Sequence, residues 1–270
     1  MNSKKTPSVL IVGCGWLGKK LGAVLTSQNY KVYGTTRSSS NFSEFSKLKI
    51  NPVKLILPVQ KKPGIYLPKT DTVIISLAPG KGKERENYVS NVNQLAQYLS
   101  EQNVNVIMYS STSVYSGNNE KTAETDTKPD KDSDNVLLAA EGTLLEYCPD
   151  AVILRLCGLY GEERHPATYM AGRKNIPDGD APVNLVHSDD VVQVTQKVIE
   201  SKLKGEIFNV CSTSHPAKKE IYTDVAERME LKKPKFLDGG ENSKIISSEK
   251  LMKKLKVKLL HPDPAEFMAE

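Results

Sequence analysis

The 270-residue sequence has few cysteines, one tryptophan and no long apolar run, and these shortages exclude several classes of protein. No apolar stretch approaches the roughly 20 residues that span a bilayer, and no signal-peptide pattern opens the chain. We therefore expect a cytoplasmic protein without a membrane partner. The four cysteines form no CxxC pair, so the sequence predicts neither a zinc site nor a disulfide framework. They are Cys14, Cys148, Cys157 and Cys211.

Charge of one sign does not dominate the sequence either. The chain has 37 basic and 32 acidic residues, a formal net charge of +5, and only 6% aromatic residues. Nucleic-acid-binding surfaces combine basic patches with aromatic side chains, so we expect no nucleic-acid partner. We expect the lysine-rich segment 232–258 to form a helix or strand with a charged outer face. Hydrophobic residues make up 39% of the chain, enough for a large α/β core.

A glycine-rich segment near the start of the chain gives the strongest positive signal. The apolar run 9–12 predicts a buried strand, and Gly13, Gly15 and Gly18 follow it at GxGxxG spacing. In this motif the first glycine permits a tight turn, and the second lets backbone amides approach a pyrophosphate. The third lets the next helix pack closely on the sheet. The segment therefore predicts a dinucleotide-binding βαβ unit.

The second predicted strand, 30–35, lacks the acidic residue that NAD-specific sites place at its end. Thr35, Thr36 and Arg37 stand there instead, and hydroxyls with a guanidinium suit a ribose 2′-phosphate. We therefore expect NADP in preference to NAD. The alternative is that Arg37 is one of many solvated cations.

Strands alternate with helices along the rest of the chain, which predicts a parallel sheet. We expect a Rossmann-type doubly wound α/β fold, with a dinucleotide-binding domain over 1–157 and a small C-terminal substrate lobe over 158–270. Ligands bind at the carboxyl ends of the strands in such sheets. The polar segment 116–134 is expected to be a long exposed loop. Further strands are expected at 52–57, 71–77, 104–109, 151–156 and 206–211, and helices at 84–102, 188–201 and 218–230.

The order of these motifs resembles the extended and atypical short-chain dehydrogenase/reductases, the epimerase/dehydratase-like proteins. The resemblance is greatest to a small bacterial sugar-nucleotide-epimerase-like group. Its landmarks are the GCGWLG segment and residues 71–78, 110–115, 155–161 and 185–191. The resemblance implies that the cofactor contacts Gly13, Gly15, Trp16, Leu17, Gly18, Thr35, Thr36, Arg37, Leu77, Ala78 and Cys157.

The Tyr-x-x-x-Lys pair of that family is missing, because none of the eleven tyrosines has Lys four residues later. Ser111 matches the family's third catalytic position, where a hydroxyl holds a substrate oxygen. Alternatively, it satisfies backbone groups at the strand end. Tyr115 is a candidate substitute acid, with core packing as the alternative. His187, Asp189 and Asp190 are expected to be structural, near a helix N-terminus, and no metal site is expected.

Three functions remain open from the sequence. The first is an NADP-dependent oxidoreductase, epimerase or dehydratase acting on a small polar or sugar-nucleotide substrate. The second is a non-catalytic NADP sensor that acts through a protein partner, and the third, ranked last, is a nucleic-acid-associated protein. The sequence does not set the oligomeric state, and a homodimer is one of the arrangements considered.

Overall fold

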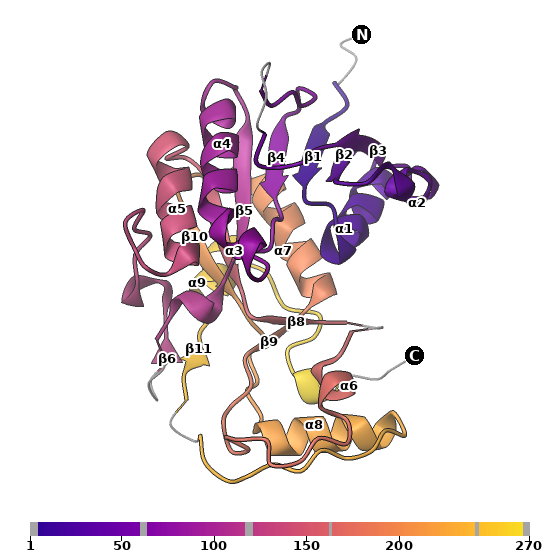
Figure 1. Ribbon diagram of the computed structural model, residues 1–270, viewed down its shortest axis with the longest axis vertical. Coiled ribbons are helices and arrows are strands. Elements are labelled where there is room, and N and C mark those ends of the chain that lie inside the picture. Colours follow the sequence, from indigo (N-terminus) through magenta and orange to yellow (C-terminus); the bar gives the residue numbers. More distant parts are fainter. Residues whose placement is uncertain (1–4, 60–63, 117–120, 162–163, 241–242, 267–270) are drawn as a thin grey trace. The chain divides into compact units, whose positions relative to one another are not determined.

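A computed structural model describes residues 5–59, 64–116, 121–161, 164–240 and 243–266 (Figure 1). Within these residues the largest sheet has seven strands in the order β10-β7-β5-β4-β1-β2-β3. The chain begins in the middle of this sheet, and β1 pairs in parallel with both β2 and β4. A parallel sheet wound outward from its first strand is the Rossmann-type arrangement, so the expected fold class is confirmed.

The strands of the large sheet are β1 (Ser8–Val12), β2 (Lys31–Thr36), β3 (Asn51–Lys54), β4 (Thr72–Ile75), β5 (Asn105–Ser111), β7 (Val152–Leu156) and β10 (Ile207–Val210). Two short parallel pairs complete the described strands: β6 (Lys121–Thr122) with β11 (Ile245–Ile246), and β8 (Gly158–Tyr160) with β9 (Leu185–His187). The helices are α1 (Trp16–Ser27), α2 (Phe42–Lys47), α3 (Lys83–Glu86), α4 (Tyr88–Ser100), α5 (Val136–Tyr147), α6 (Pro166–Met170), α7 (Ser188–Ser201), α8 (Lys218–Arg228) and α9 (Glu249–Leu255).

The chain divides into two compact units, each built from several stretches of sequence. The first comprises Met1–Ser110, Lys128–Leu154 and Lys202–Ile207, and the second comprises Ser111–Thr127, Arg155–Ser201 and Phe208–Glu270. The division expected at residue 157 is one of function, between a part that binds the cofactor and a part that binds the substrate. That functional division stays a prediction.

The core of the first unit forms where apolar runs become strands buried on both faces. Every residue of β1 and β4 is buried, as expected for central parallel strands. Helix α1 buries Leu17, Leu21 and Leu25, and α4 and α5 lie side by side (Figure 1).

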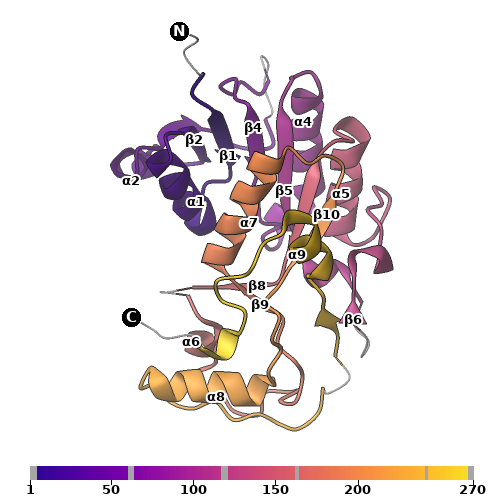
Figure 2. The same cartoon turned by 180° about the vertical axis from the view of Figure 1, so that it is seen from behind.

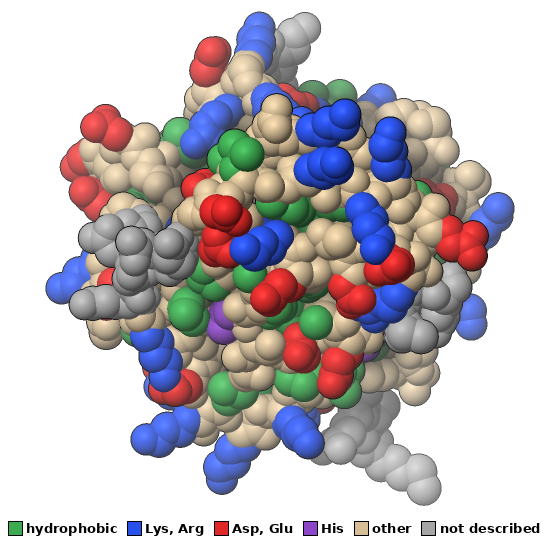
Figure 3. All heavy atoms as spheres, turned by 90° about the horizontal axis from the view of Figure 1, so that it is seen from below, with side chains coloured by type: hydrophobic (Ala, Val, Ile, Leu, Met, Phe, Trp, Pro, Cys, Tyr) green, Lys and Arg blue, Asp and Glu red, His purple; other side chains and the backbone are tan. Residues whose placement is uncertain are grey.

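The second unit has its own core around α6, α8 and the β8–β9 pair. Its buried residues are Tyr160, Ala167, Val183, Leu185, Ile221, Tyr222 and Val225. Helix α7 follows directly on β9, and α9 packs against α7 (Figure 2). Helix α9 lies in the lysine-rich segment and buries Leu251 while its lysines face outward, as expected. Acidic and basic side chains are interspersed on the face in Figure 3.

Two sequence-based expectations about local structure were wrong. Within 116–134, β6 pairs with β11, and Thr122 and Glu124 are buried. Both residues contact segments far along the chain, because Thr122 pairs with Ile246 and Glu124 Oε1 accepts from the Asn209 N–H. Residues 117–120 of that segment lie outside the described part. The single helix expected over 84–102 is divided at Asn87 into α3 and α4. In the described part of the chain, no helix has the length and apolarity to cross a membrane.

Candidate functional site

The turn between β1 and α1 requires glycine at its first position. Gly13 has φ +83°, and a Cβ there would lie 2.7 Å from the carbonyl oxygen of Ser76, just after β4. The Gly13 N–H donates to Thr35 Oγ1 at 2.8 Å. The turn is therefore held against the ends of both neighbouring strands, and only glycine fits it.

Gly15 and Gly18 have different roles in the same turn. A Cβ on Gly18 would lie 3.1 Å from Ile11 Cγ2, so this glycine lets α1 pack closely on β1. Gly15 caps α1 with a negative φ, and a Cβ there would meet nothing within 4 Å. No packing requirement explains Gly15, which leaves open space at the helix N-terminus. The first turn of α1 carries no acidic residue, so its positive end suits an anionic group such as a pyrophosphate.

The residues expected at the ribose end of a dinucleotide differ in their accessibility. Thr35 is buried with its hydroxyl bonded to Gly13, and Thr36 Oγ1 accepts from Asn41 Nδ2 at 3.0 Å. Arg37 is exposed, and its Nη1 lies 2.6 Å from Glu84 Oε1 of α3. The structure therefore places an acid beside the guanidinium that the sequence assigned to a 2′-phosphate. Nothing in the spacing of Glu84 pointed to this contact.

Sequence reasoning also missed Gly34, in the middle of β2. A Cβ there would lie 2.9 Å from Cys14 Sγ and from Phe45 Cε2. Burial raises the pKa of the Cys14 thiol to about 12, so it stays protonated at neutral pH. A glycine inside a strand often marks such a close approach, so the position of Gly34 in a predicted strand was the sequence signal for this contact.

Of the other expected cofactor contacts in this unit, Leu17 is buried, Trp16 and Leu77 are half-buried, and Ala78 is exposed.

Ser111, the first catalytic candidate, caps a short helical turn in the second unit. Its Oγ accepts from the Ser113 N–H at 3.2 Å and from Ser113 Oγ at 3.1 Å. This local role is the alternative that the hydroxyl-rich sequence had suggested. Binding of a substrate oxygen by Ser111 stays a prediction.

Tyr115, the second candidate, lies in a buried polar network. Its hydroxyl accepts from Arg155 Nη1 at 2.8 Å and donates to Asn209 Oδ1 at 2.8 Å. The Asn209 N–H in turn donates to Glu124 Oε1 at 2.7 Å. Burial raises the pKa of Tyr115, against the lowering effect of Arg155. These contacts give the phenol a structural role, and its catalytic role stays a prediction.

Cys157, the expected contact near a nicotinamide, is joined to Cys211 by a disulfide with a Cα–Cα distance of 5.2 Å. The expectation of no disulfide was therefore wrong. The two cysteines follow β7 and β10, and the Cys157 N–H donates to the Val210 carbonyl. Strand pairing brings them together although they are 54 residues apart, and spacing alone does not reveal it. Contact of Cys157 with a cofactor stays a prediction.

Asp190 takes the structural place expected at the start of α7. Its carboxylate accepts from the backbone N–H groups of Leu260 and His261, at 2.5 and 3.1 Å. Burial raises its pKa, and the two N–H groups oppose that shift. Asp190 therefore fixes the C-terminal segment to the start of this helix.

Comparison with known proteins gives a consistent family. The model of the NAD dependent epimerase/dehydratase family matches residues 9–211. Protein YeeZ of Escherichia coli K12 is 33% identical over 270 residues, covering 95% of this chain and 97% of that protein.

Solved structures share the fold over nearly the whole chain. A functionally unknown protein from Silicibacter pomeroyi superimposes with a TM-score of 0.76, 22% identity and 96% coverage of both chains. The UDP-glucuronic acid 4-epimerase of Bacillus cereus, solved in complex with NAD, gives a TM-score of 0.77 at 20% identity, covering 96% of this chain and 95% of that one.

Proposed function

Because the chain belongs to the NAD-dependent epimerase/dehydratase family, we propose that it binds a nicotinamide dinucleotide on the β1–α1 turn. The open space at Gly15 is the observation that carries this proposal. It is the one position of the turn where glycine serves no packing need. The first turn of α1 would hold the pyrophosphate, and Gly13 and Gly15 would line the turn beside it. The Gly13 N–H donates to Thr35 Oγ1 and the Gly15 N–H donates to the Gly13 carbonyl, so both glycines contribute room and shape to the site.

The proposed activity is that of an oxidoreductase, epimerase or dehydratase acting on a small polar or sugar-nucleotide substrate. When bound, the nicotinamide would supply hydride transfer. Ser111 would position a substrate oxygen through its hydroxyl, which lies at the end of β5 and is half-buried. Several structural neighbours carry sugar-nucleotide names, including the dTDP-glucose 4,6-dehydratase of Bacillus anthracis, which supports this substrate class.

We propose that the protein prefers NADP to NAD. The support is the absence of an acid at the end of β2 and the exposed guanidinium of Arg37. Titration of intrinsic or NADPH fluorescence tests it, with wild type and Arg37→Ala. NADPH should bind more tightly than NADH, and Arg37→Ala should weaken NADPH at least tenfold while changing NADH little. Equal losses would refute the preference, and no binding of either coenzyme would refute the dinucleotide site.

The engaged hydroxyls of Ser111 and Tyr115 favour a second candidate, a non-catalytic NADP sensor acting through a protein partner. The missing Tyr-x-x-x-Lys pair supports it too, because tuned proton transfer needs such a group. A screen of UDP- and dTDP-sugars and small carbonyl compounds at high protein concentration separates the two. NADPH binding without turnover of any substrate would favour the sensor.

The cytoplasmic location and the homodimer stay predictions. The Cys157–Cys211 disulfide weighs against the location, because disulfides persist mainly in oxidising compartments. Fractionation with thiol trapping tests the location, and sedimentation analysis tests the dimer.

A further inference from the structure

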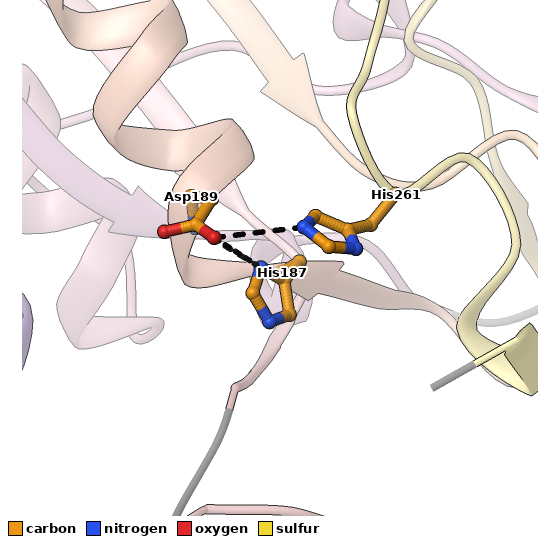
Figure 4. A group of neighbouring side chains, drawn as sticks. All are labelled: His187, Asp189 and His261. Carbon is orange, nitrogen blue, oxygen red and sulfur yellow. Dashed lines mark hydrogen bonds and ion pairs between the residues drawn. The ribbon is translucent and has the colours of Figure 1, made fainter. Parts of the chain in front are cut away.

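Two histidines and an aspartate from distant parts of the sequence meet at the start of α7 (Figure 4). His187 ends β9, Asp189 lies in the first turn of α7, and His261 lies in the C-terminal segment. Figure 4 shows one carboxylate oxygen of Asp189 facing a nitrogen of each imidazole. That oxygen, Oδ2, is 3.5 Å from His187 Nδ1 and 3.5 Å from His261 Nε2.

We propose that His187, Asp189 and His261 bind a divalent metal ion of the zinc class. One ligand atom from each residue lies within 4.8 Å of the others. Ligand atoms around tetrahedral Zn²⁺ lie about 3.3 Å apart, given bonds of about 2.0–2.2 Å to nitrogen and oxygen. The two separations of 3.5 Å from Asp189 Oδ2 are close to that value, and the two histidine nitrogens lie within 4.8 Å of each other, so side-chain rotation would bring the three atoms into coordinating positions.

The chemistry of the three side chains selects the ion. Two imidazoles with one carboxylate suit Zn²⁺ and neighbouring late first-row metals, whereas Mg²⁺ and Ca²⁺ prefer oxygen ligands alone. Three protein ligands leave a fourth tetrahedral position for water or a substrate oxygen. Solvent reaches the group from one side, because the side chains of Asp189 and His261 are 34% and 40% exposed while that of His187 is buried.

The backbone around His261 is fixed before any ion binds. Its N–H donates to Asp190 and its carbonyl accepts from Ser212 Oγ at 3.2 Å. The ring itself lies against that of His187, with centroids 3.8 Å apart and a tilt of 39° between the planes. Metal binding therefore requires rotation of the half-exposed His261 ring, while the backbone stays in place. A ligand held on a fixed backbone loses little conformational entropy on binding.

Binding would also change one existing contact. The Asp189 N–H donates to His187 Nδ1 at 3.2 Å, at the long end of the hydrogen-bond range. The ion would take over that lone pair. The bound ion would also connect the C-terminal segment to the β9–α7 junction through the His261 side chain. This connection would add to the one that Asp190 already makes with the backbone of that segment. This inference does not depend on the proposed function.

Calorimetric titration of tag-free, EDTA-treated protein with ZnCl₂ tests the site. We expect one ion per chain, at least tenfold weaker binding in Asp189→Asn and His261→Ala, and unchanged binding in His215→Ala. His215 is the matched control because it lies in the same unit and bonds to the Val183 carbonyl, outside the group. Asp189→Asn keeps the side-chain shape, so it carries the test even if His261→Ala does not fold.

Two further readouts do not depend on activity. Co²⁺ in place of Zn²⁺ should give the visible absorption of tetrahedral coordination, and Zn²⁺ should raise the melting temperature of wild type and His215→Ala but not of Asp189→Asn. The absence of both heat and the Co²⁺ band would overturn the proposal. Zn²⁺ binding that is equally strong in both ligand variants would overturn it as well, since the ion would then lie elsewhere.

Discussion

The Arg37 guanidinium is paired with the Glu84 carboxylate at 2.6 Å, so the cation proposed to bind a 2′-phosphate already has an anionic partner. Both side chains are largely exposed, at 77% and 58%, and exposed pairs are worth about 0.2–1 kcal/mol. A 2′-phosphate must displace Glu84 or bind beside it. Either way the acid opposes the phosphate.

Glu84→Gln should therefore tighten NADPH binding by up to about fivefold, the equivalent of the upper end of that pair energy, and leave NADH binding nearly unchanged. Paired fluorescence titrations measure both constants. Glu86→Gln, on the same short helix, is the control for loss of one negative charge. If Glu84→Gln strengthened NADH as much as NADPH, the carboxylate would not act on the 2′-phosphate.

Gly13 and Gly15 should respond differently to alanine. Gly13→Ala forces a side chain into φ +83° and against Ser76, which should cost about 1–3 kcal/mol of stability by urea unfolding. Gly15→Ala has room for its methyl group, so stability should stay within about 0.5 kcal/mol. Dinucleotide affinity should nevertheless fall at least tenfold. Unchanged affinity in folded Gly15→Ala would place the pyrophosphate elsewhere.

Tyr115→Phe should destabilise the protein by about 1–3 kcal/mol, because it leaves Arg155 and Asn209 each short of a buried hydrogen bond. Urea unfolding measures the loss, with exposed Tyr169→Phe as the control expected to change little. A fully stable Tyr115→Phe that lost only turnover would instead identify the phenol as catalytic.

The protein should lose stability in acid through His165. Burial, with a smaller effect of Arg228, lowers the pKa of His165 to about 4 from 6.5. The unfolded chain therefore binds this proton first as pH falls. The stability that depends on neutral His165 is therefore fully present above pH 6.5 and is lost as the pH falls towards 4. The loss in the free energy of unfolding is on the order of 3 kcal/mol. His165→Asn keeps an acceptor for the Ala167 N–H and should flatten the profile between these pH values. An unchanged slope would refute the assignment.

Reducing the Cys157–Cys211 disulfide should lower the free energy of unfolding by about 4 kcal/mol, the chain-entropy value for a loop of 54 residues. Urea titrations with and without reductant measure it. Thiol titration in denaturant without reductant should find two thiols, those of Cys14 and Cys148. Four thiols would show that the bond does not form.

Local patterns in the sequence predicted the elements that depend on local physics. Helix α7 occupies 188–201 as expected, since its acidic first turn and apolar stripe are visible in one short stretch. The β1–α1 turn followed from glycine spacing. The division of the expected helix at Asn87 is a local feature that sequence reasoning missed. The other missed contacts join distant residues: β6 with β11, Cys157 with Cys211, Glu84 with Arg37, and His261 with Asp189. No single-sequence pattern encodes which separated segments become neighbours.

The bond between Cys157 and Cys211 also makes a closed ring of the chain between them, which contains α6, β9 and all of α7. A protease that cuts one peptide bond inside this ring produces two fragments that remain covalently attached. Nicked molecules would therefore migrate as one full-length species on a non-reducing gel and separate only after reductant is added. The segment that carries His187 and Asp189 thus stays linked to the rest of the protein after such a cleavage.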